Sequence, residues 1–348
     1  VGSCTSQTTV SVTVNPVPTA VAIAATDPQI CYGGNTTITL SSQSGVSYQL
    51  RNDAGDVPVG SPVAGTGGVI SLPTGVLTSS TDFNVFATTG LGCDTEMSNV
   101  VSVTVNSQVS VTASAVTPTI CEDQTTGLSA VGAGGVGPYT YLWSGSGTAV
   151  DGSTSATPTF TPPDIAVQTV YLFTVTVTDT GFSPTVGSCT SQTTVSVTVN
   201  PVPILTATDN TTGTICSDSQ TNILLSDAVA GTSIKIVGIT ISGAPGNITG
   251  YSPVNSTFAS GSIVSDLLVN TTTSNQTIQY DFQSTASGCS SSVQTVILTV
   301  RPRAIFNVTN TPSTICEGVT SPTNIVLSSA TAGMQVRISN VVASGGVT

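Results

Sequence analysis

The chain of 348 residues carries 5 basic and 17 acidic residues, which give a net charge of −12, and only 6% of its residues are charged. Five basic side chains cannot neutralise a run of phosphates, which argues against nucleic acid as a partner. No run of about eighteen apolar residues occurs, so we expect no direct membrane insertion.

Short runs in which valine alternates with threonine or serine recur along the chain, and 38% of the residues are hydrophobic. Branched side chains suit the pleated, half-buried surface of a strand, and this hydrophobic fraction is too high for a disordered chain. The composition therefore predicts an all-β protein, and the length suggests about three domains.

The first eighteen residues, VGSCTSQTTVSVTVNPVP, recur without change at positions 186–203. Their valines alternate with polar residues, which predicts a strand whose inward face is Val10, Val12 and Val14 in the first copy. We therefore expect residues 1–16 to be the C-terminal end of a preceding domain. The unchanged recurrence indicates duplication of a unit two domains long.

Two cysteine motifs alternate along the chain, one after isoleucine and one after a small-residue turn. The Ile-Cys pairs stand 90, 95 and 100 residues apart, a spacing typical of one small β-sandwich per interval. Each Gly-Cys or Gly-Ser-Cys turn precedes an alternating run that we interpret as the closing strand of its domain. The cysteines are Cys31, Cys121, Cys216 and Cys316 in the first motif, and Cys4, Cys93, Cys189 and Cys289 in the second.

Proline follows most of these closing strands, at Pro16, Pro201 and Pro302. Because proline offers no ladder donor, it ends a strand and makes a short, stiff connection. The predicted organisation is the end of one domain at 1–16, complete sandwiches at 17–106, 107–201 and 202–302, and the N-terminal part of a further sandwich at 303–348.

The domain at 107–201 shows its two central strands most clearly. Aromatic and smaller residues alternate over 138–143 and again over 171–179, as expected of core strands. Trp143 keeps the register of Tyr139 and Tyr141. We therefore predict that Trp143 packs in the core instead of serving as an exposed platform for sugar stacking.

These residues carry a family resemblance. YLW at 141–143 with VTVTDTG at 175–181 resembles a PKD-type domain, an immunoglobulin-like sandwich. GTGG at 65–68 with LPT at 72–74, and TIC at 214–216 with TNI at 221–223, resemble the Ig-like and PKD-like repeats of Bacteroidota surface proteins. The resemblance implies a tandem array of Ig-like antiparallel sandwiches from a giant adhesin, of the gliding-motility type exported by the type IX system. Trp143 is followed by SGSG, without the acidic loop of many PKD members, so a calcium role for that loop is not carried over.

All eight cysteines are expected to form disulfides in an oxidising compartment, because the sequence has no histidine and no close C-x-x-C pair. Pairing within domains, such as Cys31 with Cys93, meets a geometric objection, because the two positions should lie at opposite ends of a sandwich. Pairing of neighbours, Cys31 with Cys189 and Cys121 with Cys289, avoids the objection and is the scheme we favour. A third scheme, beginning with Cys4 to Cys31, requires hairpin junctions.

Catalytic residues are not expected, because no histidine relay can be assembled and the paired acids Glu122-Asp123, Asp94/Glu96 and Asp53/Asp56 fall in predicted turns. No cofactor is expected. Calcium stays an alternative, with Glu122, Asp123 and Glu317 as weak candidate ligands, although no complete calcium-loop motif occurs.

The function that we expect is a structural, non-enzymatic stalk segment of a long secreted adhesin that projects from the bacterial surface and mediates attachment or gliding. Its expected partners are neighbouring repeats of the same chain, with other cell-surface proteins or extracellular polysaccharide as further candidates. The alternatives are a carbohydrate-binding module and a spacer in a large secreted polysaccharide-degrading enzyme.

Overall fold

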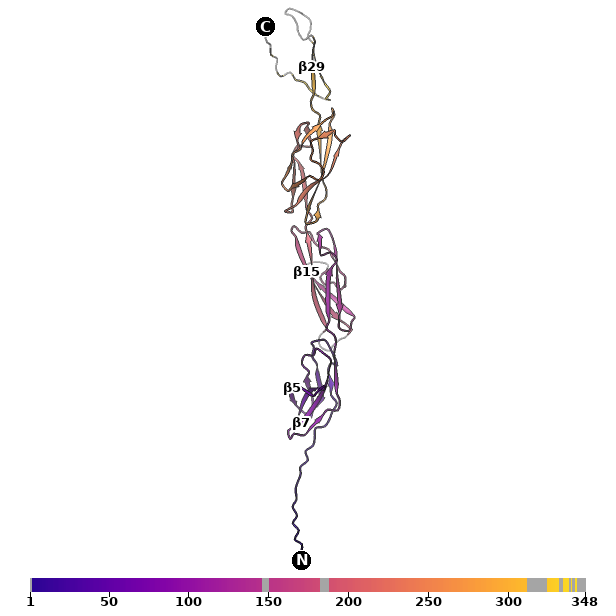
Figure 1. Ribbon diagram of the computed structural model, residues 1–348, viewed down its shortest axis with the longest axis vertical. Helices are drawn as coiled ribbons and strands as arrows, with labels where there is room; N and C mark the ends of the chain where they lie inside the picture. Colours follow the sequence, from indigo (N-terminus) through magenta and orange to yellow (C-terminus); the bar gives the residue numbers. More distant parts are fainter. Residues whose placement is uncertain are drawn as a thin grey trace, which may run out of the picture. The chain divides into compact units, whose positions relative to one another are not determined.

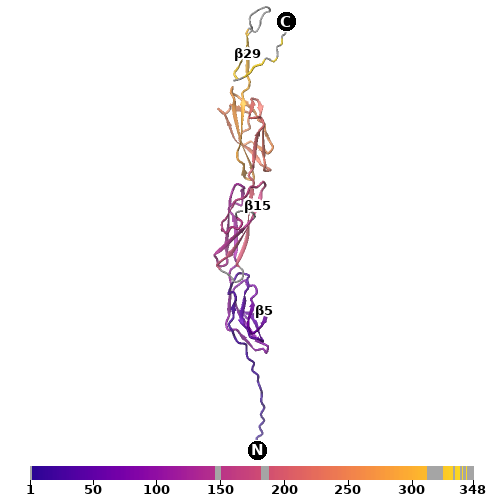
Figure 2. The same cartoon turned by 180° about the vertical axis from the view of Figure 1, so that it is seen from behind.

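The computed structural model describes residues 2–145, 150–181, 188–311, 324–331, 334–337, 339 and 342. Within these ranges the chain consists of strands, turns and extended segments, without any helix (Figures 1 and 2). Accordingly, no helix in these ranges could span a membrane. Every sheet lies within one of three stretches, 24–105, 110–200 and 205–301, apart from the hairpin of β29 (Phe306–Thr311) and β30 (Asn324–Ser329).

The stretch 24–105 is a two-sheet sandwich. The smaller sheet has the order β1 (Ala24–Ala25), β3 (Thr37–Ser41), β6 (Val69–Pro73). The larger has the order β2 (Gln29–Ile30), β9 (Val101–Val105), β7 (Thr81–Thr89), β4 (Val46–Asn52), β5 (Val57–Ala64), with β8 (Asp94–Glu96) on β7. Alternate residues of facing strands fill its core, including Ile38, Tyr48 and Phe83.

The stretch 110–200 repeats the plan. One sheet has the order β10 (Ser110–Ala115), β12 (Thr126–Ala133), β14 (Thr159–Phe160), and the other β11 (Thr119–Cys121), β16 (Thr190–Asn200), β15 (Thr169–Asp179), β13 (Tyr139–Ser144). Trp143 is completely buried, and its Nε1 donates a hydrogen bond to the carbonyl of Ser155 at 2.9 Å. The prediction that Trp143 is a core residue is confirmed.

The stretch 205–301 has three sheets. Their orders are β17 (Leu205–Asp209), β20 (Ile223–Asp227), β24 (Ile263–Val264); β18 (Thr214–Cys216), β28 (Gln294–Arg301), β26 (Gln276–Ala286), β21 (Ser233–Ile241), β23 (Thr257–Ala259), with β27 (Cys289–Ser290) on β26; and β19 (Ser219–Gln220), β25 (Leu267–Asn270), β22 (Ile248–Thr249). The core includes Ile223, Ile236, Tyr280 and Leu298.

Contacts divide the chain into two compact units, and the division passes through the 110–200 stretch. Unit 1 comprises 1–118, 125–161 and 171–197, and unit 2 comprises 119–124, 162–170 and 198–348. The fold class is the one predicted, a tandem all-β array of immunoglobulin-like sandwiches. The domain boundaries near 16, 106, 201 and 302 stay predictions.

Three of the four predicted closing strands form, as β9, β16 and β28, and β16 and β28 each end directly before a proline. The fourth prediction is wrong. Residues 2–22 form no strand, and Val10, Val12 and Val14 are 84%, 82% and 86% exposed. The physical reason is that this copy has no strand beside it, whereas β16 is flanked by β11 and β15.

Candidate functional site: the disulfide-linked junctions

Three Ile-Cys cysteines, Cys31, Cys121 and Cys216, each follow or end a very short strand that runs parallel to the closing strand of its own sandwich. The register pairs Ile30 with Val105, Cys121 with Asn200, and Cys216 with Arg301. The isoleucine before each of these cysteines is buried and fixes the strand against the core. The Ile-Cys cysteine therefore lies at the end of the sandwich where the closing strand leaves it.

The Gly-Cys cysteine lies at the opposite end. In the first sandwich β7 is antiparallel to β9, with Thr81 beside Val103, and the other end of β7 pairs Thr88 with Asp94, next to Cys93. The third sandwich has the same arrangement, in which Gln276 pairs with Val300 and Ala286 with Cys289. The strand lengths therefore separate the two cysteines of one sandwich.

Among the residues that the structure describes there are two disulfides, Cys31–Cys189 with a Cα–Cα distance of 5.5 Å and Cys121–Cys289 with 5.7 Å. These are the pairs of the neighbour-linked scheme. They exclude the alternatives that join Cys31 to Cys93 or to Cys4. Each bond ties the closing-strand end of one sandwich stretch to the Gly-Cys turn of the next.

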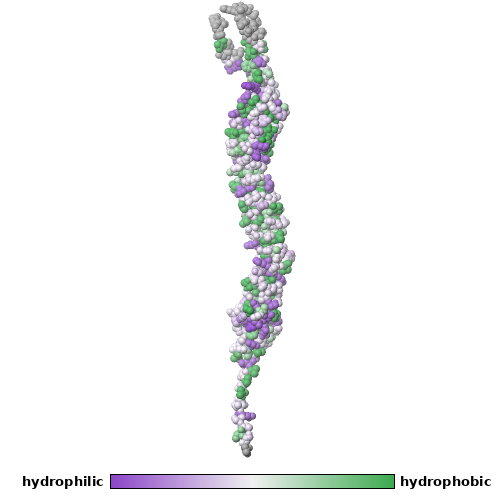
Figure 3. All heavy atoms as spheres, in the orientation of Figure 1, coloured by the Kyte–Doolittle hydropathy of each residue, from purple (hydrophilic) through white to green (hydrophobic). Residues whose placement is uncertain are grey.

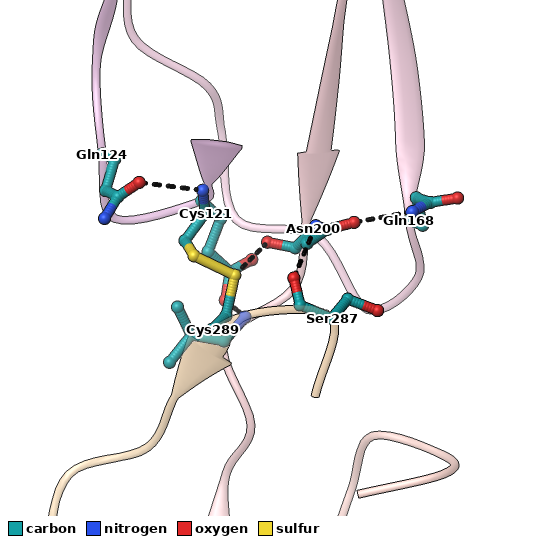
Figure 4. The surroundings of a disulfide bond; sticks show 8 residues. Cys121, Gln124, Gln168, Asn200, Ser287 and Cys289 are labelled. Carbon is teal, nitrogen blue, oxygen red and sulfur yellow. Dashed lines mark hydrogen bonds between the residues drawn. A yellow bond between two sulfur atoms is a disulfide. The ribbon is translucent and has the colours of Figure 1, made fainter. Parts of the chain in front are cut away.

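An amide network surrounds the Cys121–Cys289 bond, and Figure 4 shows Asn200 at its centre. The Asn200 side chain is buried; its Nδ2 donates to the Ser287 carbonyl at 3.0 Å, and its Oδ1 accepts from Nε2 of Gln168 at 2.7 Å. The Asn200 carbonyl oxygen accepts from the Glu122 amide at 3.0 Å and lies 3.9 Å from Sγ of Cys289. One residue thus connects the end of β16 to both flanks of the disulfide.

Glu122, one of the candidate calcium ligands, accepts hydrogen bonds from backbone amides in this structure. Its two carboxylate oxygens accept hydrogen bonds from the backbone amides of Ile165 at 2.6 Å and Val202 at 3.0 Å. Asp123 is exposed, and Glu317 lies outside the described residues. Within the described ranges no three acidic or cysteine side chains form a group that could hold a metal ion. Glu122 is therefore a carboxylate that ties three chain segments of unit 2 together.

The Cys31–Cys189 junction repeats part of this network. Asn106 directly follows β9, whereas Asn200 is the last residue of β16, and Oδ1 of Asn106 accepts from Nε2 of Gln29 at 2.6 Å. In the N-terminal copy of the repeated stretch, the contact between Asn200 and Cys289 has a counterpart, because the Asn15 carbonyl lies 3.8 Å from Sγ of Cys93. The same asparagine thus recurs beside a Gly-Cys cysteine.

Three cysteines that were expected in disulfides are free: Cys4 and Cys216, which are exposed, and Cys93, which is half-buried. The expectation is wrong for them in this chain, and spacing gives the reason. Each of the two bonds joins an Ile-Cys cysteine to a Gly-Cys cysteine 158 or 168 residues later, and none of the other cysteines in the sequence stands in that relation to Cys4, Cys93 or Cys216. Cys316 lies outside the described residues.

The other acid pairs serve local structure. The Asn84 side chain donates to Asp53 at 3.2 Å and to Asp56 at 2.8 Å across a turn, while Asp94 and Glu96 belong to β8. Elsewhere, burial and then the nearby Asp266 carboxylate raise the pKa of Tyr280, whose hydroxyl donates to Asp266 at 2.8 Å inside the third core. Asp53, Asp56 and Asp266 thus accept hydrogen bonds from neighbouring side chains, whereas Asp94 and Glu96 are exposed.

Sequence reasoning located the cysteines but missed Asn200, Gln168 and Ser287. The available signal was the Asn-Pro pair that ends both copies of the repeated stretch, Asn15-Pro16 and Asn200-Pro201. An asparagine that ends a strand before a proline has a side chain free to hydrogen-bond backbone groups nearby.

Neither a protein-family model nor a curated protein matches this chain. It is similar to solved structures of tandem extracellular domains. The Escherichia coli adhesin FdeC is 16% identical, with 83% of this chain and 99% of that chain covered and a TM-score of 0.30. Mouse cadherin-23 domains EC22–24 are 13% identical, with 80% of this chain and 94% of that chain covered and a TM-score of 0.34. The N-terminal eight Ig domains of Down syndrome cell adhesion molecule are 13% identical, with 82% of this chain and 37% of that chain covered and a TM-score of 0.41.

Proposed function

We propose that this chain is a structural stalk segment of a long secreted adhesin, which projects from the bacterial surface and supports attachment or gliding. The observation that carries the proposal is the pair of disulfides, each of which joins one sandwich stretch to the next. A covalent bond across a junction suits a protein that bears tension outside the cell, where disulfides persist.

The surface supports the same proposal. On the face drawn in Figure 3, hydrophobic and hydrophilic residues are interspersed. Exposed apolar side chains such as Val131, Leu142 and Leu172 stand on solvent faces of strands, where single apolar residues are normal. In this proposal the segment has no catalytic role, and its partners are neighbouring repeats; recognition of other surface proteins or of polysaccharide belongs to other parts of the adhesin.

Immunogold electron microscopy of whole cells, with an antibody raised against residues 107–201, tests the proposal. Gold along filaments attached to the cell is the expected result. Antigen released into the medium together with a polysaccharide-degrading activity would instead identify the segment as a spacer of a secreted enzyme. Binding of the isolated segment to polysaccharide would favour a carbohydrate-binding module.

A further inference from the structure

The two disulfides interleave along the sequence. Cys121 lies inside the loop closed by Cys31–Cys189, and its partner Cys289 lies outside that loop. The order of the four cysteines along the chain is therefore Cys31, Cys121, Cys189, Cys289, with the partners alternating.

The covalent connectivity follows directly. Three chain segments run between the two cross-links: Cys31 to Cys121 with 90 residues, Cys121 to Cys189 with 68, and Cys189 to Cys289 with 100. Each segment begins at one disulfide and ends at the other. When the two ends of the chain are pulled, the three segments therefore lie in parallel between the two disulfides.

We infer that the interleaved disulfides form an extension limiter, which caps how far the chain between Cys31 and Cys289 can be drawn out. The shortest of the parallel segments sets the cap at 68 residues, whereas the same stretch without cross-links contains 258. At about 3.6 Å per extended residue, these lengths correspond to roughly 240 Å and roughly 930 Å. Its value to the cell rests on the proposed stalk function, since only a load-bearing stalk needs a cap.

The limiting segment is the middle one. Between Cys121 and Cys189 lie β12, β13, β14 and β15, which contribute Trp143, Phe160 and Phe173 to the core of the second sandwich. Even if that sandwich unfolds completely, the 90-residue and 100-residue segments stay slack. Unfolding of the first and third sandwiches therefore cannot lengthen the chain between Cys31 and Cys289 beyond the cap.

Single-molecule force spectroscopy on the whole chain, held at its two ends and with Cys4, Cys93, Cys216 and Cys316 changed to Ser to prevent exchange, tests the inference. The account predicts a cap of 68 residues with both bonds. C31S/C189S should raise it to 90, the length of the first segment, and C121S/C289S should raise it to 100. Removal of both bonds should raise it to 258.

The strong non-additivity is the signature of interleaving: each single removal adds only about 80 to 120 Å, and joint removal adds roughly 680 Å. If the joint gain equalled the sum of the two single gains, the inference would be overturned. Treatment of the unmutated bonds with a reductant during pulling gives the fully extended value without any change to Cys31, Cys121, Cys189 or Cys289, so misfolding of a variant cannot imitate the result. The measurement uses purified chain and is independent of where the protein lies on the cell.

Discussion

Residues 1–18 and 186–203 have one sequence and two conformations. In the second copy, Thr190–Asn200 forms β16, in which Val197 and Val199 are completely buried. In the first copy the matching Val12 and Val14 are more than four-fifths exposed and no strand forms (Figure 1). The difference cannot come from intrinsic propensity, because the residues are identical.

The comparison shows that partner strands decide the conformation. The second copy pairs with β11 in parallel and lies beside β15, both of which come from the preceding eighty residues. Each backbone hydrogen bond and each buried valine of β16 depends on those neighbours. A strand is a property of a sheet, so alternation in sequence predicts a strand only where the rest of the sandwich is present.

The largest effect is expected when the first copy is given the same neighbours. Fusion of residues 107–185 in front of Val1 places the first copy in the sequence context of the second. The amides of Val10, Val12 and Val14 should then become protected from hydrogen exchange by roughly 10³-fold or more, because they enter a sheet.

In the same fusion, the added copy of Cys121 should form a disulfide with Cys93, since Asn15 already lies beside Cys93 as Asn200 lies beside Cys289. Non-reducing peptide mapping would detect this bond. Unchanged exchange rates in the first copy would contradict the role given to neighbouring strands.

The next largest effect is expected when an aspartate is placed at the same position in each copy of the repeated stretch. Val199→Asp places a carboxylate in the second core and should lower the free energy of unfolding of that sandwich by roughly 4 kcal/mol. Val14→Asp is the matched control at the same place in the repeat, and its effect should stay within about 0.5 kcal/mol. Denaturant titrations of both variants measure the difference; equal losses would show that the first copy is packed too.

The smallest change in stability is expected when the side-chain amide of Asn200 is removed. Asn200→Ala removes the bonds to Gln168 and Ser287 and leaves both partners without their contact, which should cost roughly 2 kcal/mol. Asn15→Ala, the matched control, should be close to neutral. Thermal unfolding of the oxidised chain measures both, and a neutral Asn200→Ala would show that the disulfide alone holds the junction.

Much of this fold could be predicted from single residues. Ile38, Val103 and Leu298 alternate with polar residues and are buried, and Trp143 is in the core as its register predicted. The disulfide partners could be predicted because the strand lengths keep Cys31 away from Cys93. These features depend on periodicity and on strand length, both of which are written in the sequence.

The remaining features depend on three-dimensional neighbours. The parallel strands β2, β11 and β18 are only two or three residues long, too short to show a period. Nothing near Glu122 in the sequence indicates that its oxygens accept from Ile165 and Val202, 43 and 80 residues away. The exposed first copy of the repeat could not be distinguished from its buried twin, since the two are the same.

The central claim is that successive sandwiches are joined by disulfides between neighbours. Non-reducing peptide mapping of the purified oxidised chain tests it most directly. A protease that cleaves before aspartate places Cys31, Cys93, Cys121, Cys189 and Cys289 in five different peptides. The account predicts linked peptides for Cys31 with Cys189 and for Cys121 with Cys289. A linked peptide joining Cys31 to Cys93 would contradict it.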